Sequence, residues 1–237
     1  MTQIEIGTTQ GPARLDWTTP AGTAPGPLPF VMALTHGAGG TTHAPDLLAA
    51  RDAAVQLGGG VALITQPYRV RGARAPGSAE RQDEAWIEII TWLLTTGPPA
   101  PSPHQPPAAL IVGGRSNGAR VACRTAAAVG ARGVLALAFP LQPPARRRRG
   151  SEAVVMPPDR SPELRAAATG GAHVLVLNGD RDSFGIPVAA ASTQVVVLKG
   201  EAHSLSKKPA AVAEAVAAWL TGVALLVPRE ETGDLAR

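Results

Sequence analysis

Segments rich in β-branched residues alternate with alanine-rich segments along most of the chain. The residue patterns predict strands over residues 4–8, 13–18, 30–35, 61–65, 109–112, 134–138, 173–177 and 194–198. They predict helices over residues 45–56, 78–94, 117–129, 162–168 and 209–220. Such alternation is typical of parallel strands joined by crossover helices. We therefore expect an α/β fold with a mostly parallel central sheet, helices on both faces and no large cap domain.

Length and composition favour one domain over residues 1–237. The 237 residues include 45% hydrophobic side chains, enough for one sizeable core. The 26 glycines and 23 prolines predict many tight turns between short elements. Prolines gather in a connection over residues 97–108 and in a Pro/Arg-rich irregular loop over residues 140–160. The polar tail over residues 228–237 is expected to be frayed.

Charge and cysteine content exclude several classes of protein. Much of the net charge of +4 comes from the run Arg146 to Arg149, which is either a solvated loop or a lid that attracts an anionic substrate. No aromatic residues interleave with basic ones, which argues against nucleic-acid binding. The single cysteine, Cys123, excludes an internal disulfide and a multi-cysteine metal site. Without an apolar membrane span or a signal sequence, we expect a cytoplasmic protein.

A serine lies at a strand-to-helix junction in the pattern Gly114-x-Ser116-x-Gly118. A serine held in so sharp a turn needs small residues two positions before and after it, because a Cβ there would meet the neighbouring strand and helix. The turn also places Ser116 at a helix N-terminus, where unpaired N–H groups favour a developing negative charge. The pattern predicts a nucleophile elbow, although a capped turn can have the same sequence.

Of the five histidines, His203 has the position expected of a base for Ser116. In proteins with such an elbow, the serine is followed along the chain by an acid and then by a histidine after the last strand. His203 follows the last predicted strand and precedes the last predicted helix. By contrast, His173 begins a strand and is expected to pack, and His104 lies in the proline-rich connection.

The acid is expected in the turn NGDRDSFG, which offers Asp180 and Asp182. We favour Asp182, because its spacing from Gly179 lets a tight turn carry the carboxylate toward the histidine Nδ1. Asp180 is instead expected to stabilise the turn. The carboxylate would fix the imidazole tautomer and stabilise its cation.

An oxyanion hole requires backbone donors, and two segments can supply them. One is the N–H of Asn117, directly after the serine. The other is the glycine-rich turn from His36 to Gly40, where we expect the N–H of Ala38, with Gly39 as the second choice. The glycine-rich turn is not followed by the Lys-Ser/Thr pair that a phosphate-binding P-loop has.

Six motifs, LTHGAGG, QPYRVRGARAP, GGRSNGAR, FPLQPP, NGDRDSFG and GEAHSL, resemble those of compact α/β-hydrolases similar to dienelactone hydrolase. They more closely resemble a bacterial family of small uncharacterised hydrolases. The resemblance spans the chain from Phe30 to Leu220 and implies an α/β-hydrolase fold with Ser116 as nucleophile, Asp182 as acid and His203 as base. Eukaryotic relatives include a subunit of a chromatin-modifying complex, so the fold can be kept for binding alone. The run from Arg146 to Arg149 departs from the family pattern.

Other residues have competing interpretations. Tyr68 and Arg69 follow a predicted strand and would line a substrate pocket, or stack on each other at the surface. Arg115 and Arg120 are expected to form ion pairs around the elbow. Trp86 is expected to pack between helix and sheet.

These features together predict a serine hydrolase that cleaves a carboxylic ester or thioester through an acyl-enzyme, without metal or organic cofactor. The expected partner is a small-molecule ester or thioester, anionic if the arginine run is a lid, and neither a nucleic acid nor a membrane. The alternatives are a non-catalytic binding module with a retained hydrolase shell, and an acyltransferase or cyclase that uses the same site. The sequence leaves the oligomeric state open.

Overall fold

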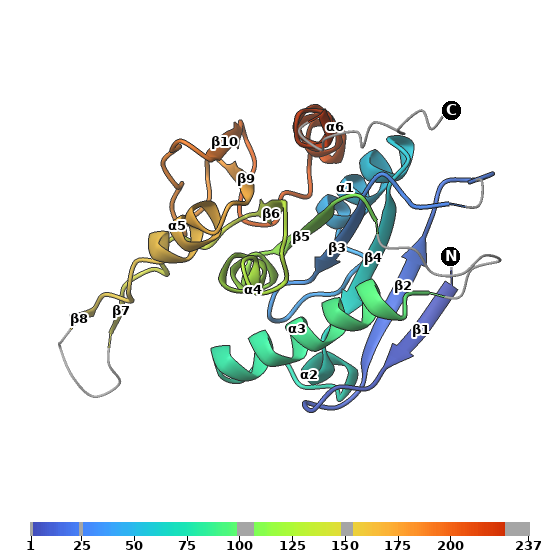
Figure 1. The fold of residues 1–237 in the computed structure, drawn as a ribbon. Coiled ribbons are helices and arrows are strands. Elements are labelled where there is room, and N and C mark those ends of the chain that lie inside the picture. The colour runs from blue at the N-terminus through green and yellow to red at the C-terminus, as the bar shows by residue number, and fades with distance from the viewer. Residues whose placement is uncertain (1, 24–25, 99–106, 148–153, 226–237) are drawn as a thin grey trace, which may run out of the picture.

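The structure is a computed structural model that describes residues 2–23, 26–98, 107–147 and 154–225. A sheet of eight strands crosses its centre in the order β1-β2-β4-β3-β5-β6-β9-β10 (Figure 1). The strands are β1 (Thr2–Ile6), β2 (Ala13–Thr18), β3 (Val31–Thr35), β4 (Gly60–Thr65), β5 (Leu110–Arg115), β6 (Gly133–Leu137), β9 (His173–Gly179) and β10 (Thr193–Leu198). Strand β2 is antiparallel to both of its neighbours, and all the other pairs are parallel.

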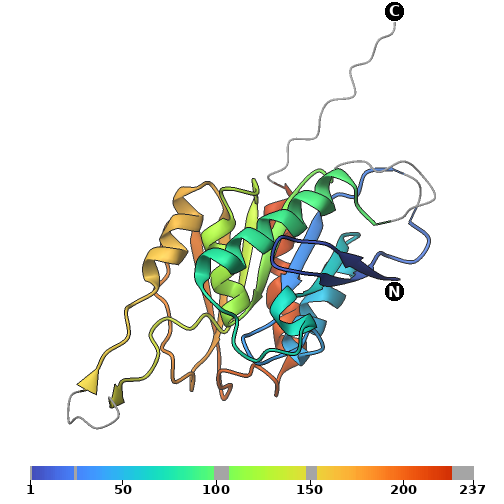
Figure 2. The same ribbon diagram turned by 90° about the horizontal axis from the view of Figure 1, so that it is seen from below.

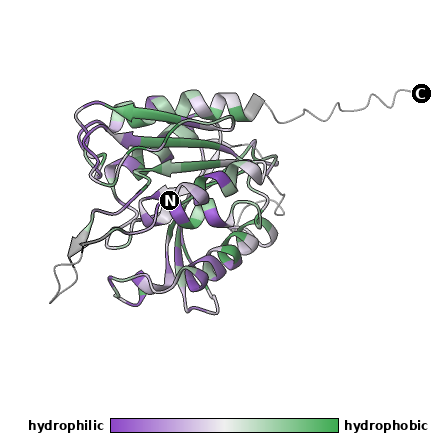
Figure 3. Cartoon of the chain, turned by 90° about the vertical axis from the view of Figure 1, so that its left-hand side faces the viewer, coloured by the Kyte–Doolittle hydropathy of each residue, from purple (hydrophilic) through white to green (hydrophobic). Residues whose placement is uncertain are grey.

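Helices cover both faces of this sheet (Figure 1). Helices α1 (Pro45–Gln56) and α6 (Pro209–Leu225) pack on one face, and α3 (Ala79–Thr95), α4 (Asn117–Thr125) and α5 (Ser161–Thr169) pack on the other. The central strands are buried on both sides, as β3 and β6 show with every residue buried, so they are continuous apolar runs rather than alternating ones. Figure 3 shows these strands as predominantly hydrophobic. The prediction of a mostly parallel sheet between helical layers, without a large cap domain, is confirmed.

Some element ends differ from the prediction: α4 ends at Thr125 rather than at residue 129, and two other differences involve glycine or proline. Strand β5 continues through Gly113 and Gly114 to Arg115, because Gly114 pairs in register with Thr35 of β3. The segment after β4, where the sequence predicts neither helix nor strand, contains a single helical turn, α2 (Pro67–Val70). Its proline occupies the first helical turn, where the missing N–H costs no hydrogen bond. A helix of four residues is too short to show periodicity in the sequence.

The Pro/Arg-rich segment contains a two-residue antiparallel ladder between β7 (Arg146–Arg147) and β8 (Val154–Val155). Figure 2 shows this hairpin extending from the side of the body. Arg148 and Arg149 lie outside the described residues, as do His104 and the tail over residues 228–237. The expected lid and the expected frayed tail therefore stay predictions.

The chain reverses its direction of winding at β3. Strand β4 lies on one side of β3 and β5 on the other, so the segments that follow β3 and β5 meet at the same edge of the sheet. Ligand sites of open α/β sheets lie at such switch points. In the part of the chain described here, no helix has the length and apolar character to span a membrane.

Candidate active site

Ser116 occupies a strained turn between β5 and α4. Its φ of 53° and ψ of −111° lie outside the usual regions for a residue with a side chain. The turn is held by a hydrogen bond of 2.8 Å from the Ser116 N–H to the carbonyl of Leu137 on β6. A Cβ on Gly118 would lie 2.7 Å from the Thr35 oxygen, and one on Gly114 would lie 2.5 Å from the same oxygen. Only glycine fits at these two positions, as the elbow pattern predicts.

Ser116, His203 and Asp182 form a hydrogen-bonded chain. His203 Nε2 lies 2.9 Å from Ser116 Oγ, and His203 Nδ1 lies 2.9 Å from Asp182 Oδ2. In the neutral imidazole, these two hydrogen-bond partners place the proton on Nδ1, which donates to the carboxylate. Nε2 is then free to accept from the serine hydroxyl. The ring of Phe184 stacks at a tilt on the His203 ring, with 4.4 Å between centroids. The structure therefore brings together the three side chains that the sequence proposed, although His203 is 87 positions from Ser116.

The two candidate acids have different partners. The Asp182 side chain is buried, and its Oδ1 accepts a hydrogen bond of 2.9 Å from the Phe184 N–H. The exposed Asp180 accepts a hydrogen bond of 2.7 Å from the Gly200 N–H instead. Asp180 thus joins two turns, as a turn-stabilising residue would, and Asp182 faces the histidine.

The glycine-rich turn after β3 lies beside the serine. A Cβ on Gly37 would be 3.4 Å from Ser116 Cβ, and the Gly40 N–H closes the turn on the Gly37 carbonyl at 3.0 Å. Ala38 and Gly39 form the tip of this turn, and Asn117 begins α4 on the other side of Ser116. The backbone donors proposed from the sequence thus come from two segments that flank the serine.

His36, the first residue of this turn, is fully buried and has a structural role. Its Nδ1 donates to the Gly37 carbonyl at 2.9 Å, and its Nε2 accepts from the Gln66 N–H at 3.1 Å. Burial lowers the pKa of His36 and so favours the neutral ring. Both ring nitrogens are engaged by the backbone, which leaves His36 no part in proton transfer at Ser116.

Tyr68 and Arg69 on α2 also hold the glycine-rich turn. Tyr68 Oη donates to the Ala38 carbonyl at 3.0 Å, and Arg69 Nε donates to the Gly40 carbonyl at 3.2 Å. Burial raises the pKa of Tyr68 to about 12, so its hydroxyl remains a donor across the physiological range. Tyr68 is buried and its ring meets the His36 ring in a T-shaped arrangement, which is not the arrangement of a tyrosine stacked on a surface arginine.

Two residues that support the site, Asp46 and Gln82, were not identified from the sequence. The fully buried Asp46 lies 3.2 Å from Arg115 Nε, and Arg115 also donates to the His203 carbonyl at 3.0 Å. On the other side, Gln82 Oε1 accepts a hydrogen bond of 2.6 Å from the Asn117 side chain. Asp46 and Gln82 lie in helices remote in sequence from the elbow and belong to no recognisable motif.

The structure also places the side chains expected to pair or pack. Arg115 and Arg120 form the expected ion pairs, with Asp46 and Glu163 respectively. Trp86 and Cys123 are buried in the core layer between the sheet and α3 and α4, as packing residues would be.

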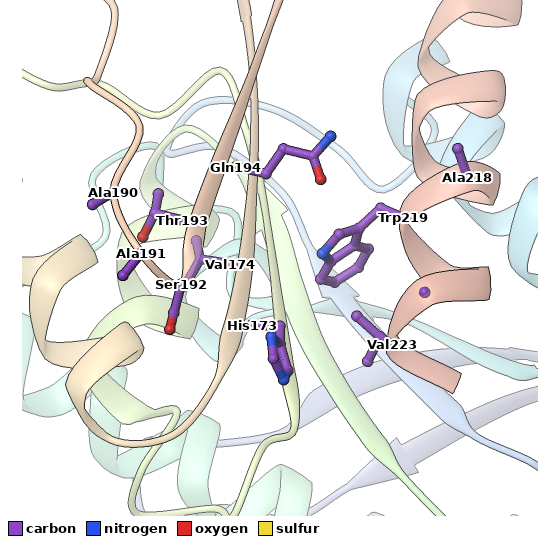
Figure 4. A pocket seen from close by; sticks show the side chains of 11 residues that line it. His173, Val174, Ala190, Ala191, Ser192, Thr193, Gln194, Ala218, Trp219 and Val223 are labelled. Atoms are coloured by element: carbon purple, nitrogen blue, oxygen red, sulfur yellow. The ribbon is translucent and has the colours of Figure 1, made fainter. Parts of the chain in front are cut away.

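A cavity of about 400 Å³ lies away from these residues, between the beginnings of β9 and β10 and the last turns of α6 (Figure 4). Trp219 and Val223 extend into it from α6 toward Gln194 and His173. Strand β9 begins at His173 and ends at Gly179, close to Asp182, so this cavity lies at the opposite end of the strands from Ser116. Within the described ranges, no group of three or more His, Cys, Asp or Glu side chains is placed to hold a metal ion.

Comparisons with known proteins agree with this fold. The family described as "alpha/beta hydrolase domain" matches residues 29–219. A search among curated proteins gave no match. Among solved structures, an α/β serine hydrolase without a lid from Xanthomonas campestris is similar with a TM-score of 0.67, 18% identity and coverage of 96% of this chain and 95% of that one.

Two further structures resemble the chain to a similar degree. An α/β serine hydrolase homologue from Coxiella burnetii has a TM-score of 0.70 at 14% identity, with 92% of this chain and 97% of that chain covered. A dienelactone hydrolase from Anabaena variabilis has a TM-score of 0.64 at 16% identity, with 93% and 96% covered. At these identities the likeness establishes the shared fold.

Proposed function

Because the chain belongs to the alpha/beta hydrolase family, we propose that it is a serine hydrolase that cleaves a carboxylic ester or thioester through an acyl-enzyme. Ser116 is the nucleophile, His203 the general base and Asp182 the residue that orients and stabilises the imidazole. The hydrogen-bonded chain of two 2.9 Å contacts carries this proposal.

In each half of the reaction, His203 accepts one proton and then donates it. His203 Nε2 takes the Ser116 proton as Oγ bonds to the substrate carbonyl carbon, and the carbonyl π electrons move to the oxygen. The tetrahedral intermediate collapses, His203 gives its proton to the leaving alcohol or thiol, and the acyl group stays on Oγ. In the second half, His203 deprotonates water, which attacks the acyl carbon, and the proton returns to Ser116 as the carboxylic acid leaves.

The backbone is suited to bind the oxygen that becomes negatively charged. The N–H groups of Asn117 and Ala38, with Gly39 as the second choice, donate to this oxyanion. The α4 N-terminus adds its positive end at the same place, since Ser116 directly precedes the first helical residue. Tyr68 and Arg69 act on this step by fixing the carbonyls of Ala38 and Gly40, so their proposed role is to position the turn rather than to contact substrate.

The contact distances favour an enzyme over a binding module with a retained hydrolase shell. A hydrolase fold kept only for binding does not need its serine, histidine and carboxylate within hydrogen-bonding distance of one another. In this chain both contacts have the length of good hydrogen bonds. An acyltransferase would use the same acyl-enzyme but transfer the acyl group to an acceptor other than water.

The decisive experiment labels the purified protein with a fluorophosphonate probe and measures hydrolysis of p-nitrophenyl acetate. We expect covalent labelling at Ser116, and loss of both labelling and turnover in Ser116→Ala with an unchanged circular dichroism spectrum. Ser204→Ala is the matched control, because Ser204 is an exposed serine next to His203 in the chain and contacts Ser206 instead. A folded wild-type protein that neither labels nor turns over substrate would refute the proposal, and so would a Ser116→Ala variant that keeps its activity.

A further inference from the structure

The side chain of Asn178 lies behind the candidate acid and is fully buried. It is near the end of β9, one residue beyond the last pair between β9 and β6. There its amide makes two hydrogen bonds to the backbone of Phe139: Oδ1 accepts from the N–H at 3.0 Å, and Nδ2 donates toward the carbonyl at 3.2 Å. The side chain thus continues the contact between the two strands after their ladder has ended.

The same amide reaches Asp182. Asn178 Nδ2 lies 3.1 Å from Asp182 Oδ2, the oxygen that also accepts from His203 Nδ1. Nδ2 is also 3.1 Å from the carbonyl of Gly185, which closes the turn containing Asp182. Burying a carboxylate oxygen costs free energy unless hydrogen-bond donors face it. Asn178 supplies such a donor, and because its amide is neutral it does not exchange a proton with His203.

We infer that Asn178 is a positioning residue for the reaction, which fixes Asp182 Oδ2 toward His203 by linking the acid turn to the end of β6. This inference rests on the proposed function for its catalytic consequence, but the link itself is a property of the folded chain. Because Asn178 is buried behind Asp182, its loss should lower kcat and leave KM nearly unchanged.

A double-mutant cycle between Asn178→Leu and Asp182→Ala tests the link in the free energy of unfolding, which requires no activity. Leucine has the same branching as asparagine but can neither donate nor accept a hydrogen bond. We expect the two substitutions together to destabilise the protein clearly less than the sum of their single effects. The matched cycle of Asn178→Leu with Asp180→Ala should be additive, because Asp180 contacts Gly200 and not Asn178. Additive effects in the Asp182 cycle would overturn the inference, whether or not the protein proves to be a hydrolase.

Asn178→Asp tests the catalytic role in a variant of nearly identical shape. Aspartate keeps an acceptor for the Phe139 N–H but can donate to Asp182 only when protonated. We expect kcat for p-nitrophenyl acetate to fall at least about tenfold at alkaline pH, the size of one hydrogen bond to a charged group. The ratio of wild-type to variant kcat should then shrink as the pH falls and the introduced carboxylate regains its proton. A ratio that stays constant with pH, or a loss of less than about twofold, would show that Asn178 has only a structural role.

Discussion

Arg115 and Asp46 form an ion pair directly beneath the candidate site, with 3.2 Å between Arg115 Nε and Asp46 Oδ2. Burial outweighs the attraction of Arg115 and raises the pKa of Asp46 from its ordinary value of 3.8 to about 6. The folded protein therefore binds this proton more tightly than the unfolded chain does. The contribution of Asp46 to stability is greatest below about pH 4 and is lost as the pH rises through 6.

Asp46→Asn should remove this dependence. We expect the difference in unfolding free energy between wild type and variant to change by roughly 2 kcal/mol between pH 4 and pH 7, with the wild type losing stability relative to the variant as the pH rises. Urea titrations of both proteins at pH steps across this range measure it. Comparing the two proteins at each pH cancels the contributions of other titrating groups, such as His36, because both proteins contain them. Parallel pH profiles would show that Asp46 titrates as it does in the unfolded chain.

Asp182→Asn should reduce kcat by about 10³-fold or more, because an amide at this position can donate to His203 and favour the wrong tautomer. Asp180→Asn is the matched control, with the same chemical change in the same turn on an exposed side chain. Its amide oxygen can still accept from the Gly200 N–H, so we expect activity within about threefold of wild type. Equal losses in the two variants would indicate a disturbed turn rather than a lost acid.

Tyr68→Phe removes one hydroxyl and its hydrogen bond to the Ala38 carbonyl. A neutral hydrogen bond of this kind is worth about 1 kcal/mol, so we expect kcat to fall about three- to tenfold through a loosened oxyanion turn. Steady-state kinetics with p-nitrophenyl acetate, beside a thermal unfolding curve, separate this effect from a loss of fold. A rise in KM with unchanged kcat would instead assign Tyr68 to substrate binding, the alternative suggested by its sequence position.

Gly118→Ala and Gly222→Ala should have opposite effects on stability, although both glycines lie in helices. A Cβ at Gly118 would lie 2.7 Å from the Thr35 carbonyl and 2.8 Å from that of His36, both of which are backbone atoms that cannot rotate away. We expect a loss of about 1–3 kcal/mol. A Cβ at Gly222 meets no atom within 4 Å, so alanine should stabilise α6 by about 0.5–1 kcal/mol. Denaturant titration measures both, and a stabilised Gly118→Ala would contradict the close approach at the elbow.

The sequence was informative where a role depends on a short contiguous segment. Ser116, Asp182 and His203 each lie in a turn that directly follows or nearly follows a strand, so local patterns and chain order were enough to nominate them. The central strands were recognisable because they are buried on both faces and therefore continuously apolar.

The sequence was uninformative where a role depends on a partner that only the fold supplies. Asp46 and Gln82 are ordinary residues of two separate helices until the fold places Arg115 and Asn117 beside them. Asn178 lies inside a recognised motif, but its function depends on Phe139, which lies 39 positions away in the chain. The role of Tyr68 was equally hard to predict from the sequence, since its partner Ala38 precedes it by 30 positions.

The order of strands across the sheet has a consequence for the newly made chain. The Ser116 turn is complete once β5, α4 and β6 have formed, but His203 and Asp182 arrive only when β9 and β10 have docked beside β6. Such distant pairings form late, because the entropy of closing a long loop must be overcome first. An incompletely synthesised or partly folded chain therefore carries a serine without its base. Covalent labelling of Ser116 should accordingly distinguish finished molecules from unfinished ones in a refolding reaction.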